Sequence, residues 1–168
     1  MKLLYYNAYL LPMFDYCSTV WGKNNKMYIN KILILQKRAA KLILNKPIRT
    51  TTDVLFKQLI WLTFTDRCKY HTALLVYKTL NHMAPSYMSD IITASTNNSY
   101  SLRSLLRNDF VLKHKTKTKY INYSFNYYCM TVWNKIPIEI RNAANIKSFK
   151  CFTRNICVSV EYDIIDMP

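Results

Sequence analysis

Glycine is almost absent from this chain of 168 residues, which contains only Gly22. Loops that cradle phosphate groups, and the tight elbow that presents a nucleophilic serine, both need glycine, because a side chain would block the backbone there. The sequence therefore excludes a Gly-rich phosphate-binding loop and a hydrolase built on a nucleophile elbow.

Acidic residues are also scarce: nine Asp and Glu stand against 24 Lys and Arg, which gives a net charge of +15. Polymerase-type phosphoryl transfer needs carboxylates that hold two metal ions about 4 Å apart, and no two acids here are adjacent. The only cluster, Glu161, Asp163 and Asp166, lies in the C-terminal tail. We predict no catalytic residue, no metal site and no cofactor in this chain.

The cysteines form neither a disulfide pattern nor a metal-binding pattern. They are an odd number, widely spaced, without a CxxC pair: Cys17, Cys68, Cys129, Cys151 and Cys157. This usage argues against a secreted disulfide framework and predicts reduced thiols, mostly in the core. Cys68 and His71 are closely spaced, but no second pair completes the four ligands that a structural zinc needs.

Long apolar runs are missing as well. Asn7 and Pro12 interrupt the N-terminal stretch MKLLYYNAYLLPMFDYC, which is shorter than the roughly 20 residues that span a bilayer. No small-x-small cleavage site follows it. We expect no membrane partner and an intracellular location, nuclear or cytoplasmic, rather than secretion.

What the chain does contain is apolar and basic material. Hydrophobic residues make up 51% and aromatic residues 14%, enough for a buried core in one domain, or a domain and a subdomain. The positive charge favours nucleic acid or another polyanion as partner, and no small-molecule substrate is indicated. The alternative is a basic surface that is merely solvated, or one that absent acidic sequence neutralises.

Helical periodicity dominates the first half and predicts a small, mainly α bundle. We expect a helix over 3–20 that bends at Pro12 and stops at Gly22, and a short helix in TTDVLFKQLIWL capped by Thr52 or Asp53. A longer helix should begin near Thr65 and stop before Pro85.

The clearest helix covers 26–44 and ends before Pro47. At about 100° per residue its apolar side chains share one broad face: Ile29, Ile32, Leu33, Ala39, Ala40 and Ile43. The opposite face carries Lys26, Lys31, Lys37, Arg38 and Lys41.

The second half begins with a polar linker, TASTNNSYSLRS. We predict a helical domain over 1–92, the linker over 93–104, a basic part over 105–160 and a frayed tail over 161–168. Within the basic part we expect an extended arm or short β-hairpin, a helix over FNYYCMTVWNKI that Pro137 ends, and a last helix capped near Asn145. The last helix should bury Ile146, Phe149, Phe152 and Ile156.

Two basic patches are candidates for contact with a nucleic-acid backbone, because Lys and Arg neutralise phosphates and nearby aromatic rings can stack on bases. They comprise Lys31, Lys37, Arg38 and Lys41 in the first half and Arg103, Arg107, Lys113, Lys115, Lys117 and Lys119 in the second. For each patch the alternative is a solvated basic face.

Four segments in order resemble one known family. They are LLYYNAYLLPMFDYCSTVWG, YINKILILQKRAAKLIL, LFKQLIWLTFTDRCKYHTALLVYKTLNHMAPSYM and SFNYYCMTVWNKIPIEIRNAANIKSFK. Together they are similar to the thumb and downstream region of non-LTR retrotransposon (LINE, jockey-like) reverse transcriptases. The similarity runs from about residue 3 to residue 157, nearly the whole chain.

The resemblance implies a thumb-like, non-catalytic C-terminal fragment of an RNA-directed DNA polymerase. Its partners would be the RNA/DNA template–primer and the missing palm and fingers, and the parent's palm would use Mg²⁺. The aromatic-x-Asp-Asp box of that palm is absent here. The residues carried over are Lys37, Arg38, Trp133, Asn134 and Pro137; Cys129-Met130 departs from the family, whose members commonly have Gly there.

Trp21, Trp61 and Trp133, with Tyr127 and Tyr128, are interpreted as core anchors rather than base-stacking platforms. The structural motif residues also include Asn134, Pro137 and Phe149. Two other functions stay open on the sequence alone. One is a free-standing basic RNA/DNA-binding module, and the other is a helical protein-interaction domain, which an exposed apolar patch would indicate.

Overall fold

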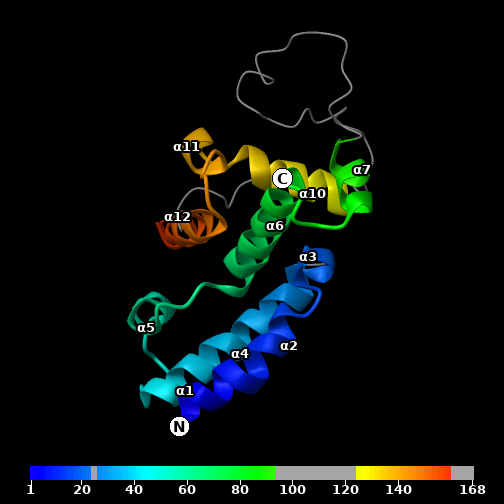
Figure 1. Cartoon of the computed structure of the whole chain (residues 1–168). Helices are drawn as coiled ribbons and strands as arrows, with labels where there is room; N and C mark the ends of the chain where they lie inside the picture. The colour runs from blue at the N-terminus through cyan, green and yellow to red at the C-terminus, as the bar shows by residue number, and fades with distance from the viewer. Residues whose placement is uncertain (24–25, 94–123, 160–168) are drawn as a thin grey trace. The chain divides into compact units, whose positions relative to one another are not determined.

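The computed structural model describes residues 1–23, 26–93 and 124–159, and every regular element in these ranges is a helix (Figure 1). The predicted mainly α class is confirmed. The predicted extended or β-hairpin segment near 105–123 lies outside the described residues, and no strand within them supports it. The chain forms two compact units, Met1–Cys68 and Lys69–Pro168, while the sequence-based domain limits stay a prediction.

The first unit starts with a helical rod in three parts: α1 Lys2–Tyr5, the π-helical turn η1 Tyr6–Leu10, and α2 Leu11–Asp15. Pro12 has no N–H to donate, and in a regular α-helix its ring would collide with the carbonyl four residues earlier. The wider π turn directly before it relieves this conflict. Pro12 is therefore accommodated within the rod.

The predicted helix over 3–20 is wrong at its C-terminal end, because the chain turns after α2. Tyr16 has extended backbone with ψ 118°, and Cys17 is left-handed with φ 50°. The short helix α3, Ser18–Trp21, follows, and the Trp21 indole Nε1 donates to the Tyr16 carbonyl at 2.6 Å.

Helix α4 spans Lys26–Leu44, the bounds that the sequence predicts. Of its expected apolar face, Ile29 and Ala40 are buried, and Gln36 is buried beside them because its Nε2 donates to the Leu62 carbonyl at 2.9 Å. Helix α5, Thr52–Leu59, is also predicted, but its N-cap is Thr51 instead of Thr52 or Asp53.

Two small apolar clusters hold the first unit together. One centres on Ile29, Phe64 and Cys68, with Phe14, Trp21 and Ile32 packed around it; the other centres on Ala40, Leu55 and Phe56, with Leu33, Leu44, Leu59 and Trp61. The single glycine belongs to the first cluster. A Cβ on Gly22 would collide with the Ser18 carbonyl and the Cys68 thiol, so this close approach requires glycine.

The second unit contains most of α6, Phe64–Leu80, with α7 Ser86–Thr93, α10 Phe125–Asn134, α11 Ile138–Arg141 and α12 Ile146–Ser159. Helix α7 has no counterpart among the predicted helices. The cap of α6 was predicted near Thr65, but Thr63 is the residue whose Oγ1 accepts from the Asp66 backbone N–H, at 3.2 Å.

One contiguous apolar cluster forms the core of the second unit. Tyr77 and Phe149 stack at 4.2 Å between ring centres, and the Tyr77 hydroxyl donates to the Ala143 carbonyl at 2.6 Å. The other buried members are Ala73, Leu74, Val76, Ile92, Cys129, Met130, Trp133 and Ile136. Phe152 was predicted to be buried and is 49% exposed; Thr153, one turn after Phe149, takes the buried position instead.

Candidate nucleic-acid interface

The candidate site lies where α4 ends. Asn45 takes the left-handed conformation with φ 51°, and the Lys46 backbone N–H bonds to the Lys41 carbonyl at 3.0 Å, which closes the helix. The Lys2 ammonium also caps this end: it donates to the Leu42 carbonyl at 3.0 Å and to Asn45 Oδ1 at 2.7 Å. Both interactions suit the negative end of a helix.

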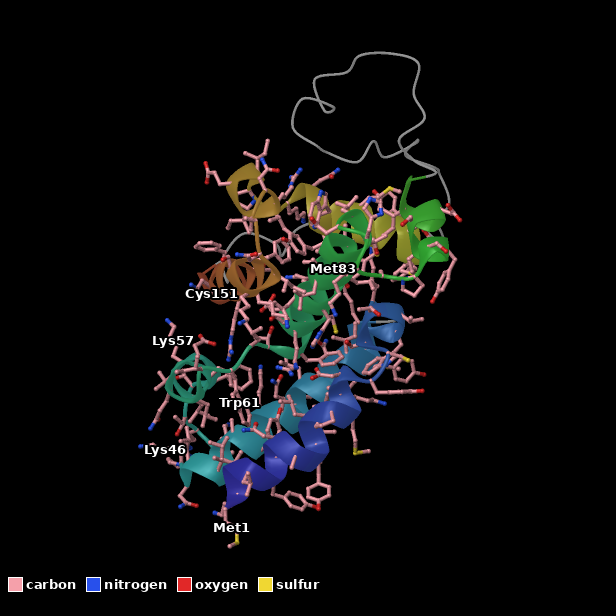
Figure 2. All side chains as sticks on the ribbon, in the orientation of Figure 1. Met1, Lys46, Lys57, Trp61, Met83 and Cys151 are labelled. Atoms are coloured by element: carbon pink, nitrogen blue, oxygen red, sulfur yellow. The ribbon has the colours of Figure 1, made fainter. Side chains whose placement is uncertain are left out.

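The last three turns of α4 and the turn that follows line a groove of about 670 Å³, called here the α4 groove. Its lining is Ile34, Lys37, Arg38, Lys41, Leu42, Asn45, Lys46 and Ile48. Figure 2 labels Lys46, which lies just beyond the helix end. The α4 groove thus combines four cations with three aliphatic side chains and no acid.

Three of these cations have no charged or hydrogen-bonding partner within the part of the chain that the structure describes. Among the described residues, the side chains of Lys37, Arg38 and Lys46 form no ion pair and no hydrogen bond. Lys41 instead donates to the Ile48 carbonyl, and so holds the turn against the helix. Unpaired cations in a concave surface raise the local concentration of anions.

The carboxylate of Asp15 in the first unit is paired with an arginine outside the α4 groove. Asp15 accepts a two-pronged ion pair from the Arg67 guanidinium, whose Nη2 lies 2.5 Å from Oδ2. A planar guanidinium and a carboxylate fit each other in this geometry. The pair joins α2 to the start of α6 within the first unit. Asp15 is not among the residues that line the α4 groove.

The predicted basic residues fall into three groups. Lys37, Arg38 and Lys41 line the α4 groove. Lys31 lies on the same helix outside it, with its ammonium 5.5 Å from the centre of the Tyr28 ring. The residues of the second patch, Arg103, Arg107, Lys113, Lys115, Lys117 and Lys119, lie outside the described residues.

Sequence reasoning missed Lys46. The residue follows the predicted end of the helix, so a helical projection of 26–44 leaves it out. Only the left-handed cap at Asn45 folds the chain back and brings Lys46 and Ile48 to the groove. The pair of a capping Asn and a following proline, Pro47, is the signal that could have indicated this return of the chain.

The three tryptophans predicted as core anchors lie in apolar clusters, whereas Tyr127 and Tyr128 are only partly buried. Trp21 stacks on Phe64 at 5.2 Å between ring centres, and Trp61 stacks on Tyr6 at 4.1 Å. Trp133 is 3% exposed, in the cluster that also contains the fully buried Phe149.

The remaining motif residues form a bridge across the end of α10. Pro137 is the N-cap of α11. The buried Arg141 donates through Nη2 to the Asn134 carbonyl at 2.8 Å and through Nε to the Ile136 carbonyl at 2.6 Å, and it lies 5.9 Å from the centre of the Trp133 ring. Arg141 is a second residue that the sequence analysis did not identify.

No arrangement among the described residues suggests a reactive centre. None of their His, Cys, Asp and Glu side chains gather in groups of three or more that could hold a metal ion. Burial raises the pKa of the Cys68 thiol to about 12, and that of Cys129 likewise, so both thiols stay protonated and unreactive. None of the described helices is long and apolar enough to cross a membrane.

Comparison of the chain with protein-family models, with curated proteins and with solved structures finds no match.

Proposed function

We propose that this chain is a thumb-like, C-terminal part of a retroelement-derived RNA-directed DNA polymerase, inert by itself, that contributes contacts to the backbone of a template–primer. One observation carries the binding part: among the residues that the structure describes, Lys37, Arg38 and Lys46 in the α4 groove have no partner, and no acid lines the groove. Fixed cations of this kind neutralise phosphates and release their counterions, which drives binding of any sequence.

The parent family is proposed from the four ordered segments that resemble non-LTR reverse transcriptases. In such a polymerase the chemistry and its Mg²⁺ would belong to the palm, and this chain would hold nucleic acid only. An intracellular location, nuclear or cytoplasmic, follows from the same proposal, because the template–primer is found there.

An exposed apolar face on the N-terminal helices supports a polypeptide neighbour such as the palm and fingers. The N-terminal apolar face is defined by Leu4, Tyr5, Tyr9, Met13, Tyr16 and Val20, each between 59% and 76% exposed. Residues 3–22 include no Lys or Arg, and their one acid, Asp15, is paired with Arg67. In a chain of net charge +15, this uncharged face is suited to burial against protein and poorly suited to phosphate.

The same face favours a second candidate function, a helical protein-interaction domain, in which the α4 groove would meet an acidic partner. A free-standing RNA/DNA-binding module is the third. The binding readouts below separate the nucleic-acid functions from the protein-interaction function.

The test of binding is a charge reversal in the α4 groove. We expect Lys37→Glu with Arg38→Glu to weaken binding of a labelled oligonucleotide at least tenfold, measured by fluorescence anisotropy at fixed salt. The matched control is Lys147→Glu with Lys150→Glu, which makes the same charge change on exposed positions of α12. Equal losses in the two double variants would show that only net charge matters and would remove the α4 groove from the proposal.

The parent family has its own test. Sequencing of full-length transcripts upstream of Met1 is expected to reveal an open frame that passes through an aromatic-x-Asp-Asp box. The purified chain is expected to show no polymerase activity on a primed template with Mg²⁺. Measurable synthesis by the purified chain would contradict the assignment as a non-catalytic part.

A further inference from the structure

We infer that the α4 groove is selective for single-stranded nucleic acid. This inference rests on the proposed function and adds the class of strand to it. Its basis is the composition of the groove, in which Ile34, Leu42 and Ile48 lie among the cations. Leu42 and Ile48 are 68% and 88% exposed, so their apolar surface is available to a ligand.

The aliphatic side chains distinguish the two forms of nucleic acid. A duplex presents charged phosphates and sugars on its outer surface, and its base faces are stacked inside, with only base edges open in the grooves. In contact with a duplex, the Leu42 and Ile48 side chains would face a largely polar surface, so they would gain little apolar contact. A single strand exposes its base faces, and these are apolar surfaces that can cover the aliphatic side chains.

The cations are placed for one strand rather than for two. Lys37, Arg38 and Lys46 come from one helix end and the turn that follows it, and all line one concavity. A flexible strand can turn successive phosphates toward them while its bases meet Ile34, Leu42 and Ile48. In a template–primer such a strand is the unpaired part of the template.

The apolar contact is tested with Leu42→Asn. The matched control is Leu4→Asn on the N-terminal apolar face, because Leu4 is 73% exposed against 68% for Leu42. Binding of a 20-nucleotide single strand and of the blunt duplex of the same sequence is measured by anisotropy for each protein. We expect the wild type to prefer the single strand, and Leu42→Asn to lose about fivefold on the single strand and little on the duplex.

The charge contact is tested with Lys46→Glu against Lys57→Glu. Lys57 is exposed and lies in the last turn of α5, so both changes place a negative charge near the end of a helix and only one falls in the α4 groove (Figure 2). We expect Lys46→Glu to weaken single-strand binding about tenfold and Lys57→Glu about twofold or less. Circular dichroism and melting temperature establish that each variant folds.

The outcomes separate the inference from the proposed function. If the wild type binds neither the single strand nor the duplex, the proposed function fails. If it binds the duplex as tightly as the single strand, or if Leu42→Asn weakens both equally, the proposed function stands and the single-strand inference is overturned. Polyglutamate of equal charge serves as competitor: if it displaces the single strand as well as unlabelled strand does, the α4 groove is a site for acidic polypeptide and the inference fails.

Discussion

The two units of the chain differ in how their apolar cores are divided. In the second unit, one contiguous apolar cluster forms the core, and the Tyr77 hydroxyl donates to the Ala143 carbonyl beside it. The first unit has two smaller clusters, and Tyr6 and Gln36 are buried within it, 2% and 3% exposed. It also carries the α4 groove and the N-terminal apolar face.

This difference suggests that the two units differ in stability. A single larger apolar cluster provides more stability than two smaller ones, because apolar burial is the main favourable term in folding. The two smaller clusters of the first unit provide less stability. A neighbouring polypeptide that covered the exposed apolar side chains would increase the stability of this unit. We therefore expect the second unit to be the more stable one. Substitutions in each unit and a change of pH test this difference.

The largest effect is expected from tryptophan truncation in the two units. Trp133→Ala should lower the free energy of unfolding of the second unit by about 3–5 kcal/mol, the usual cost of removing a large buried aromatic side chain. Trp61→Ala should lower that of the first unit by less, because Trp61 is only partly buried. Urea unfolding measures both free energies of unfolding, and thermal unfolding gives the melting temperatures. Equal melting temperatures for Trp133→Ala and wild type would overturn the assignment of Trp133 to the core.

Arg141 tests whether the second unit depends on its polar bridge. Arg141→Met keeps much of the side-chain volume and leaves the Asn134 and Ile136 carbonyls without their donor. The expected loss is about 1.5–3 kcal/mol in the free energy of unfolding, as for hydrogen bonds to a charged group. Lys135→Met, an exposed position directly after α10, is the control and should change stability little.

Alkaline pH tests the buried groups of each unit. Burial raises the pKa of Tyr6 from 10.0 to about 12, against the opposing influence of the Arg67 charge, and raises the pKa of Cys68 and of Cys129 from 9.0 to about 12. At a pH between the ordinary pKa and the raised pKa of each group, that tyrosine or thiol is deprotonated in the unfolded chain and protonated in the folded chain. Stability should therefore be full below about pH 9 and should fall as the pH rises toward 12.

The first unit should be the more sensitive, because Tyr6 and Cys68 both belong to it. Urea midpoints at pH 8 and pH 10.5 measure the fall for wild type, Cys68→Ala and Cys129→Ala. Each variant should lose part of the pH dependence. A fall that is the same in all three proteins would show that neither thiol contributes.

The smallest effect is a gain in stability of the first unit. Ile60 ends α5 in the left-handed conformation with φ 54°, which a β-branched side chain tolerates poorly. It is 67% exposed, so little packing is lost on substitution. Ile60→Gly should raise the free energy of unfolding by about 1 kcal/mol in thermal or urea unfolding. A loss would indicate that the Ile60 side chain packs against something not described here.

Parts of both units could be predicted where one residue pattern determines the structure. The bounds of α4 follow from its apolar periodicity and from Pro47, and the cap of α10 at Ser124, which accepts from the Tyr127 N–H at 3.3 Å, follows an ordinary N-cap pattern. The turn at Tyr16 and Cys17 could not be predicted. No glycine or proline occurs there, and yet Cys17 is left-handed with φ 50°.

The candidate site was predictable only in part for the same reason. The basic face of α4 is visible in the sequence, and it includes Lys37, Arg38 and Lys41. That these residues line a groove, with Lys46 as a fourth cation, depends on the return of the chain after Asn45. Phe152 was assigned to the core of the second unit because it is apolar, whereas the packing of α12 places Thr153 there.

The most direct test of the central claim, that unpaired cations of the α4 groove hold a nucleic-acid strand, is the salt dependence of binding. Each neutralised phosphate of a single strand contributes about −0.7 to the slope of log Kobs against log salt concentration. Loss of Lys37 and Arg38 should therefore make the slope of the Lys37→Glu/Arg38→Glu variant shallower than that of wild type by about 1.4. The Lys147→Glu/Lys150→Glu control should keep the wild-type slope. An unchanged slope in the groove variant would contradict the claim.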